Sequence, residues 1–478
     1  MSTTLNAMFR HLRGDSRSRW IASAAVPLGV LALAGLLGAK ASPLIFGAIA
    51  ALFAVIALVE KPQIGPVLLI GTAYLVPFEI GVSGSISANA VIMLLPILFV
   101  IWGLRKIRTR GQQFYWSRTY LPLLLFPLAA GVAWLAGNAS WDVSFPQPGN
   151  LLLVQLGQWS IYVFAVMAYI LAAHQTLNTL KWVTAVFLGL GILALIGRYG
   201  GPVNALVNPW LKPYAVSNGS FFVWMTALAA GQALFNQGLK RSWRIALFAL
   251  AAAVPILGFW QNTDWASSWL PPLLALIIVL WLRSRFVSIS FFFALILILA
   301  LFSGVILGSY DWQAEREISV GGRFILWESV LGLSAQHPVL GLGLTTYRQY
   351  FQFIPLLTEA GRWWRPNVNS HNLYIDLFAQ MGIVGLAVFG WAVFEIGRLG
   401  WRLQQRCSGD FAAGYVASAL AGLIAMLVAS AIVEWLLPFV YNVGFPGMRF
   451  SVMSWLFLGG LASLDRILPD PVPDQTVS

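Results

Sequence analysis

The sequence has little charge for its length. Only 10% of its 478 residues are charged and 59% are hydrophobic, whereas an ordinary soluble domain has roughly 25% charged residues. The mean hydropathy of +0.77 is correspondingly high. No soluble core could bury this much apolar surface. The shortage of charge therefore excludes a soluble globular protein and indicates a chain that crosses a lipid bilayer many times.

Cysteine is nearly absent as well, since Cys407 is the only one in the chain. A single cysteine excludes a disulfide framework and a cysteine-based metal site. The compartment of the loops therefore has to be inferred from the distribution of charge.

Long apolar runs, in contrast, recur along the whole chain. A spanning helix needs about 20 mostly apolar residues. The sequence predicts an all-α polytopic membrane protein with about 12 to 14 transmembrane helices, a range that allows for the shorter runs being re-entrant. The candidate spans are residues 20–39, 43–59, 63–80, 86–104, 119–137, 150–173, 180–197, 217–236, 243–260, 265–282, 287–309, 373–397, 411–434 and 448–464.

Basic residues outnumber acidic ones, 29 to 17, and give a net charge of +12. With the N-terminus inside and the spans alternating in direction, 20 of the 29 basic residues fall in cytoplasmic segments. This bias follows the positive-inside rule and favours both termini in the cytoplasm. The basic charge therefore reflects membrane topology, and we do not expect a nucleic-acid partner.

One connection is far longer than the others, and the chain divides around it. A long ordered loop among short connections is usually functional. Inside this loop, the pattern predicts an amphipathic helix over residues 314–336 and a short helix over 345–353. We expect a basic cytoplasmic tail (1–19), transmembrane helices 1–11 (20–309), an extracytoplasmic catalytic loop (310–372), transmembrane helices 12–14 (373–466) and a disordered cytoplasmic tail (467–478).

Nine basic residues fall on the outer side of the predicted topology, and five of these are arginines of the long loop. Guanidinium groups stay charged and bind phosphate oxygens in pairs, which suits an anionic, lipid-linked substrate at the membrane surface. The alternative is that these arginines contact lipid headgroups or pair with the loop's own acids. The candidates are Arg323, Arg348, Arg362 and Arg365 of the long loop, and Arg198 of a shorter outer loop.

His371 lies at the outer mouth of the predicted span 373–397. A histidine can accept a proton near neutral pH, as a base that activates a sugar hydroxyl must; the alternative is a structural histidine bonded within the loop. Asp376 and Glu434 are acids in or near spans, where ionisable groups are costly and often functional. Trp363 and Trp364, between two of the arginines, could stack on a sugar ring.

Four motifs follow one another in this region. They are Gly322-Arg323-Phe324-x-x-Trp327, His337-Pro338-x-x-Gly341-x-Gly343, Ser370-His371-Asn372-Leu373-Tyr374 and Gly382-Ile383-Val384-Gly385-Leu386. In their order and spacing they resemble the O-antigen ligase and polymerase superfamily, and the resemblance covers about 65 residues of the chain.

The resemblance implies a GT-C-like enzyme at the outer face of the bacterial inner membrane. Members transfer a glycan from undecaprenyl diphosphate to an acceptor, which is lipid A core for ligases and another lipid-linked unit for polymerases. The family's proposed base corresponds to His371 and a proposed diphosphate contact to Arg323. Many relatives also have a Ser-Arg-Gly segment before the long loop; here residues 262–267 contain Asp264 and no arginine. Either another arginine such as Arg198 replaces it, or the donor differs.

The leading hypothesis is glycan transfer without a metal or a nucleotide cofactor. The expected partners are an undecaprenyl-diphosphate-linked glycan, an acceptor glycan or glycolipid, and the bilayer. One alternative is a secondary transporter or channel of a small anion, for which the polar pair Gln155 and Gln158 inside a predicted span is the main support. Another is a non-catalytic component of an envelope polysaccharide assembly complex.

Overall fold

The structure is a computed structural model of the chain. The predicted tail 1–19 and the predicted spans 20–39 and 43–59 lie outside the described residues. So do residues 302–320, which include the end of the predicted span 287–309 and the start of the predicted long loop. The elements from Gln63 onward form one compact unit. The residues described are 61–76, 79–83, 86–108, 115–211, 219–261, 266–301, 321–353, 356–357, 363–364 and 370–468.

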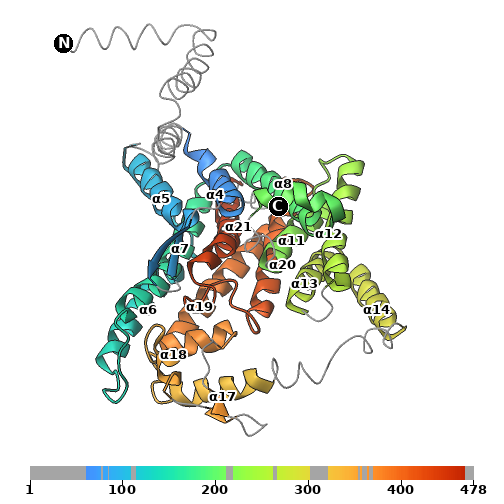
Figure 1. The fold of residues 1–478 in the computed structure, drawn as a ribbon. Coiled ribbons are helices and arrows are strands. Elements are labelled where there is room, and N and C mark those ends of the chain that lie inside the picture. The colour runs from blue at the N-terminus through green and yellow to red at the C-terminus, as the bar shows by residue number, and fades with distance from the viewer. Residues whose placement is uncertain are drawn as a thin grey trace, which may run out of the picture. The chain divides into compact units, whose positions relative to one another are not determined.

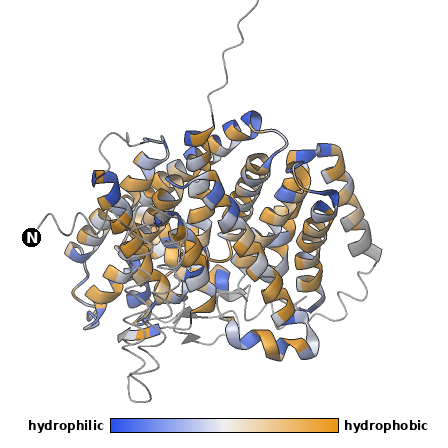
Figure 2. Ribbon diagram, turned by 90° about the horizontal axis from the view of Figure 1, so that it is seen from above, coloured by the Kyte–Doolittle hydropathy of each residue, from blue (hydrophilic) through white to orange (hydrophobic). Residues whose placement is uncertain are grey.

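The described unit is a bundle of apolar helices, which confirms an all-α polytopic membrane protein (Figure 1). Nine of the described helices are long and apolar enough to cross a membrane, and Figure 2 shows apolar residues along their lengths and hydrophilic ones mainly near their ends. The bundle helices are α4 (Gly65–Leu75), α5 (Ala90–Arg108), α6 (Tyr120–Ala139), α7 (Leu151–Ala173), α8 (Leu177–Tyr199), α11 (Gly219–Phe235), α12 (Arg241–Gln261), α13 (Ala266–Arg283), α14 (Arg285–Leu301), α19 (Leu373–Arg406), α20 (Phe411–Ala429) and α21 (Met448–Ile467).

Two of the predicted spans are shorter in the structure. The span predicted over 63–80 ends with α4 at Leu75, and an antiparallel hairpin of β1 (Glu79–Ser83) and β2 (Ile86–Asn89) follows. Val76 is extended, as the residue before a proline prefers to be. The span predicted over 411–434 ends with α20 at Ala429. The apolar residues after it belong to an irregular segment, so hydropathy alone placed this boundary wrongly.

Helices α11, α20 and α21 are the most completely buried of the described bundle helices. α11 packs on α20 and α13, α21 packs on α7, and α19 packs on α6. Small residues allow the close approaches. A Cβ atom added at Gly459 of α21 would lie 2.2 Å from the carbonyl oxygen of Tyr169 in α7.

The long loop contributes two helices, α17 (Gly321–Ser334) and α18 (Thr346–Phe351), which match the described parts of the two helices predicted there. They lie together at the lower end of the bundle in Figure 1 and pack on each other and on α19. Two short strands, β3 (Leu356–Leu357) and β4 (Trp363–Trp364), pair in the same loop. A second connection, which the sequence predicts to be on the outer side, folds as η3 (Gly201–Val203), α9 (Asn204–Val207) and η4 (Asn208–Trp210).

Helix α19 is broken at Gly382, where φ is 61° and ψ is −159°. The turn that follows α17, residues 337–344, fills the break. The N–H of Leu342 in the turn donates to the carbonyl of Ala379 in α19 over 2.8 Å. The N–H of Ile383 in α19 donates to the carbonyl of Pro338 in the turn over 2.9 Å. Backbone groups inside a membrane need partners within the protein. The turn supplies them, and the loop is thereby fixed to the spanning helix.

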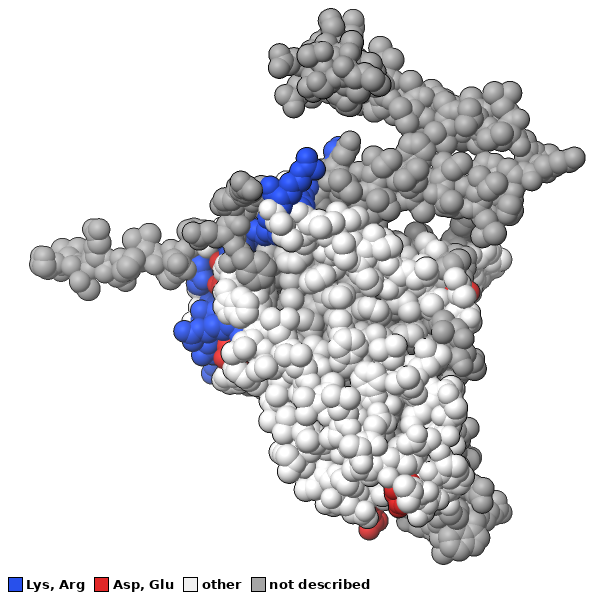
Figure 3. Space-filling view, turned by 90° about the vertical axis from the view of Figure 1, so that its left-hand side faces the viewer, with Lys and Arg blue, Asp and Glu red and all other residues white. Residues whose placement is uncertain are grey.

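Charge is distributed unevenly over the described surface. On the face drawn in Figure 3, lysine and arginine side chains gather in the upper half, while the lower end, where Figure 1 places α17 and α18, shows acidic side chains. This separation agrees with the segregation of basic residues along the sequence. The sidedness derived from it, with both termini in the cytoplasm, stays a prediction.

Candidate functional site

The site is built against residues 430–444, which we call the outer segment after the side of the membrane that the sequence predicts for it; it connects α20 to η6 (Phe445–Gly447) and α21. Gln158 of α7 accepts from the N–H of Val440 at 2.8 Å and donates to the carbonyl of Pro438 at 3.3 Å. Arg348 of α18 donates to the carbonyl of Tyr441 at 2.8 Å. The outer segment is therefore held in place from the bundle and from the long loop.

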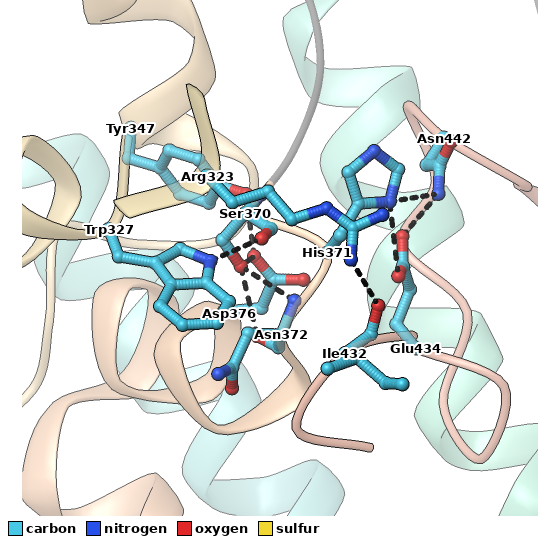
Figure 4. Close-up of polar contacts among 10 residues, drawn as sticks. All are labelled: Arg323, Trp327, Tyr347, Ser370, His371, Asn372, Asp376, Ile432, Glu434 and Asn442. Atoms are coloured by element: carbon cyan, nitrogen blue, oxygen red, sulfur yellow. Dashed lines mark hydrogen bonds and ion pairs between the residues drawn. The ribbon is translucent and has the colours of Figure 1, made fainter. Parts of the chain in front are cut away.

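His371 stands immediately before α19, with its backbone in the left-handed region at a φ of 52°. The next residue, Asn372, caps α19 by accepting from two backbone N–H groups. The Nδ1 atom of His371 lies 3.7 Å from a carboxylate oxygen of Glu434 and 3.5 Å from the amide nitrogen of Asn442. Asn442 also donates to Glu434 (Figure 4). Both partners of the imidazole thus come from the outer segment.

Arg323 reaches the same place from α17. Its guanidinium donates to the carbonyl of Ile432 at 3.4 Å, two residues before Glu434. One turn further along α17, Trp327 donates to the carbonyl of Ser370 at 2.6 Å, next to His371. Figure 4 shows Arg323 directed at Ile432 and His371 directed at Glu434, two residues further along the chain. The structure therefore brings together the two residues that the sequence singled out first.

Asp376, on the first turn of α19, is almost completely buried beneath His371. One carboxylate oxygen, Oδ1, accepts from the hydroxyl of Tyr347 at 2.6 Å and from that of Ser370 at 2.7 Å. Burial, with the neighbouring Asp376 as a further cause, raises the pKa of Tyr347 well above its ordinary value. The Tyr347 hydroxyl therefore stays protonated and acts as a donor.

The other predicted site residues lie in different surroundings. The guanidinium of Arg348 lies 4.2 Å from the centre of the Tyr441 ring and also donates a hydrogen bond to the Tyr441 carbonyl. Arg198 lies in the last turn of α8, with its guanidinium 5.6 Å from the ring centres of Tyr199 and Phe222.

Four further predicted residues lie in β3–β4 or next to it. Trp363 and Trp364 form β4, whereas Arg362 and Arg365 lie outside the described residues. Within the described ranges, no group of three or more His, Cys, Asp or Glu side chains is arranged to hold a metal ion.

Three contributors to the cluster carried no signal in the sequence. Tyr347, Asn442 and Tyr441 belong to no charged group or motif, and each reaches the site through contacts with residues distant in sequence. Ser370 and Trp327 belong to the family motifs, but the sequence assigned no role to either. A tyrosine hydroxyl directed at an acidic residue one turn into the next span could not have been assigned without the fold.

The fold and the cluster define a multi-spanning membrane protein with a histidine, an arginine and buried acids gathered where a long loop meets the bundle. Residues 244–390 match the family model described as O-antigen ligase (Wzy_C), which supports the resemblance to the O-antigen ligase and polymerase superfamily that the motifs carry. The matched region includes Arg323, His371 and Asp376. The family suggests a membrane glycosyltransferase-like function. No curated protein matches the chain.

Proposed function

We propose that the protein transfers or polymerises a glycan from an undecaprenyl-diphosphate-linked donor at the outer face of the bacterial inner membrane. The observation that carries this proposal is the meeting of Arg323 and His371 against one short stretch of the outer segment, Ile432 to Glu434. A cation for the leaving group and a base for the attacking hydroxyl are the two groups that such a transfer needs.

In the proposed reaction, His371 takes the proton of an acceptor hydroxyl while the oxygen attacks the anomeric carbon of the donor. The bond from that carbon to the diphosphate oxygen breaks, and the diphosphate leaves with the electron pair. Glu434 faces Nδ1 of His371, which leaves Nε2 for the acceptor and stabilises the imidazolium that forms. Arg323, with donors beyond the one directed at Ile432, binds the leaving diphosphate.

Further roles extend the proposal to the remaining predicted residues. Arg198, Arg348, Arg362 and Arg365 are proposed as additional contacts for the diphosphate or its lipid surroundings, and Trp363 and Trp364 as surfaces for a sugar ring. These roles need the loop strands to approach a bound donor.

The transport alternative depended on Gln155 and Gln158, and their contacts favour a structural role. Gln155 accepts from Trp134 at 2.7 Å and donates to the carbonyl of Leu344 in the turn of the long loop at 3.2 Å. Gln158 holds the outer segment. Both amides are therefore engaged in anchoring the two chain segments that form the site.

The test is envelope glycan profiling in a strain that lacks the chain, complemented with wild type, His371→Ala, Arg323→Ala or His337→Ala. His337 lies in the same loop and outside the cluster, so it serves as the matched control. We expect wild type and His337→Ala to restore glycan chain length and attachment. We expect the other two variants to lose about 100-fold or more of the activity, as removal of a general base or of one transition-state donor does. Full restoration by His371→Ala and Arg323→Ala at normal protein levels would contradict the proposal.

The donor is tested separately with purified protein in proteoliposomes that contain undecaprenyl-diphosphate-linked glycan. Release of undecaprenyl diphosphate that depends on an added acceptor glycolipid supports the assigned donor. Retained glycan transfer in the strain without such release in the vesicles would assign a different donor.

A further inference from the structure

The backbone of His371 is held in an unusual conformation. Among the described residues, only His371 and Thr345 have a positive φ without being glycine. The left-handed region costs about 1–2 kcal/mol for a residue with a side chain, and such a conformation persists only where the surroundings determine it strongly. The groups next to His371 must therefore supply this constraint.

The residue before His371 is fixed on three sides. The carbonyl of Ser370 accepts from Nε1 of Trp327 at 2.6 Å, its N–H donates to the hydroxyl of Tyr347 at 3.3 Å, and its Oγ contacts Oδ1 of Asp376 at 2.7 Å. Ser370 is fully buried. Rotation of the Ser370–His371 peptide would break the hydrogen bond from Trp327, and a displacement of Ser370 as a whole would break all three.

Asp376 is the centre of this arrangement. It is 2% exposed, and its Oδ2 atom has no hydrogen-bond partner among the described residues. A buried acid with an unused oxygen is costly. Tyr347, also fully buried, stacks on Phe439 with ring centres 5.6 Å apart and directs only its hydroxyl at Asp376 and Ser370. These three side chains join α18, the end of the loop and α19 directly behind the histidine.

We propose that Tyr347, Ser370 and Asp376 are positioning residues that lock the left-handed backbone of His371 and so aim its imidazole at the place beside Arg323 where the acceptor hydroxyl binds. None of the three touches the substrate. The inference rests on the proposed role of His371 as the base, and it assigns to the buried acid a role that acts through the histidine.

The first test observes the imidazole itself. The chain has four histidines, so the side-chain histidine NMR spectrum of labelled protein in nanodiscs is simple, and His371→Ala identifies the signal of His371. We expect Tyr347→Phe and Asp376→Asn to shift or broaden that signal. The matched control is Tyr350→Phe on the same short helix, whose hydroxyl accepts from the N–H of Asp142; it should leave the signal unchanged. An unaltered His371 signal in both Tyr347→Phe and Asp376→Asn overturns the proposal.

The second test is kinetic. With the undecaprenyl-diphosphate-linked donor in proteoliposomes, Tyr347→Phe and Ser370→Ala should lower kcat by up to about 100-fold, as a misplaced catalytic group does, with KM for the donor unchanged. In a His371→Ala background, Tyr347→Phe should have no further effect on the residual rate, because a positioning residue acts only through the group that it positions. An equal loss in both backgrounds shows a general defect of folding and overturns the proposal.

The two tests separate this inference from the proposed function. If His371→Ala is fully active, the proposed function fails, whatever the NMR spectrum shows. If His371→Ala is inactive while Tyr347→Phe, Ser370→Ala and Asp376→Asn keep wild-type kcat, the function stands and the positioning network fails. Asp376→Asn is the variant most prone to misfold, and Tyr347→Phe, which removes one oxygen, keeps the inference testable in that case.

Discussion

The carboxylate of Glu434 lies 3.7 Å from Nδ1 of His371 and is buried. Because a base becomes positively charged as it takes the acceptor proton, a nearby carboxylate stabilises the transition state. Glu434→Gln keeps the shape and removes the charge, so we expect kcat to fall by about 10- to 100-fold. The control is Glu395→Gln on α19, which breaks the ion pair with Arg398 at 3.0 Å far along the helix. Equal rates for the two variants would show that Glu434 has no part in the reaction.

Arg348 holds Tyr441 in place and is also proposed as a contact for the diphosphate, and one variant can separate these two roles. Its guanidinium already binds the carbonyl of Tyr441 and stacks on the ring. We expect Arg348→Ala to lower the stability of the detergent-solubilised protein by about 1–3 kcal/mol, measured by thermal unfolding. Arg285→Ala removes an exposed arginine near Trp281 and should change little. A variant of Arg348 that unfolds like wild type but raises KM for the donor would instead show a role in substrate binding alone.

For single residues, the sequence singled out the charged members of the cluster around His371 and missed Tyr347, Tyr441 and Asn442. Arg323 and His371 belong to motifs whose residue types suggest the chemistry directly. Tyr347 and Asn442 matter only because folding brings them to Asp376 and to Glu434. No local pattern contains that information, since Tyr347 and Asp376 are 29 residues apart and Asn442 meets Glu434 inside an irregular segment with no repeating pattern.

Helix α19 depends on glycine where its hydrogen-bond ladder is interrupted. At Gly382 the backbone lies in a region that is essentially restricted to glycine, and a Cβ atom there would lie 2.3 Å from the carbonyl oxygen of Val339. We expect Gly382→Ala to destabilise the protein by about 2–5 kcal/mol, from the backbone strain and the overpacking together. The measurement is the yield and thermal unfolding of the folded protein in detergent.

The same helix offers the control for this prediction. A Cβ atom at Gly390 would meet nothing within 4 Å, so Gly390→Ala should be neutral or slightly stabilising. If Gly382→Ala and Gly390→Ala had the same stability, the break in α19 at Gly382 would contribute nothing to the stability of the fold. That outcome would also weaken the view that the turn of residues 337–344 fixes the loop to the bundle.

At the scale of helices and strands, hydropathy predicted the helices that are continuous apolar spans. Most described bundle helices begin and end within a few residues of the predicted spans. The break at Gly382 was not predicted, because a glycine inside an apolar run looks the same whether the helix continues or stops. The hairpin of β1 and β2 was also missed, because its first strand directly follows an apolar run and is held by a residue that is distant in sequence. The guanidinium of Arg449 contacts Glu79 in β1 and the carbonyls of Ala73 and Val76 at the end of α4.

For the whole molecule, the segregation of basic residues predicts which end faces the cytoplasm. The single cysteine makes this testable, since Cys407→Ser gives a cysteine-free background. Val143→Cys, at a residue that is 96% exposed in the connection between α6 and α7, should react with a membrane-impermeant maleimide on intact cells. Lys240→Cys, in the exposed connection between α11 and α12, should react only after permeabilisation. The reverse pattern would invert the topology and remove the long loop from the outer face.

The filled break in α19 also bears on how the chain enters the membrane. The turn of residues 337–344 precedes residues 379–384 in the chain, so the groups that complete the broken ladder are synthesised before the ladder itself. When residues 379–384 are synthesised, the groups that pair with their amides and carbonyls are therefore already part of the chain. The order of residues along the chain is thus also a workable order of assembly.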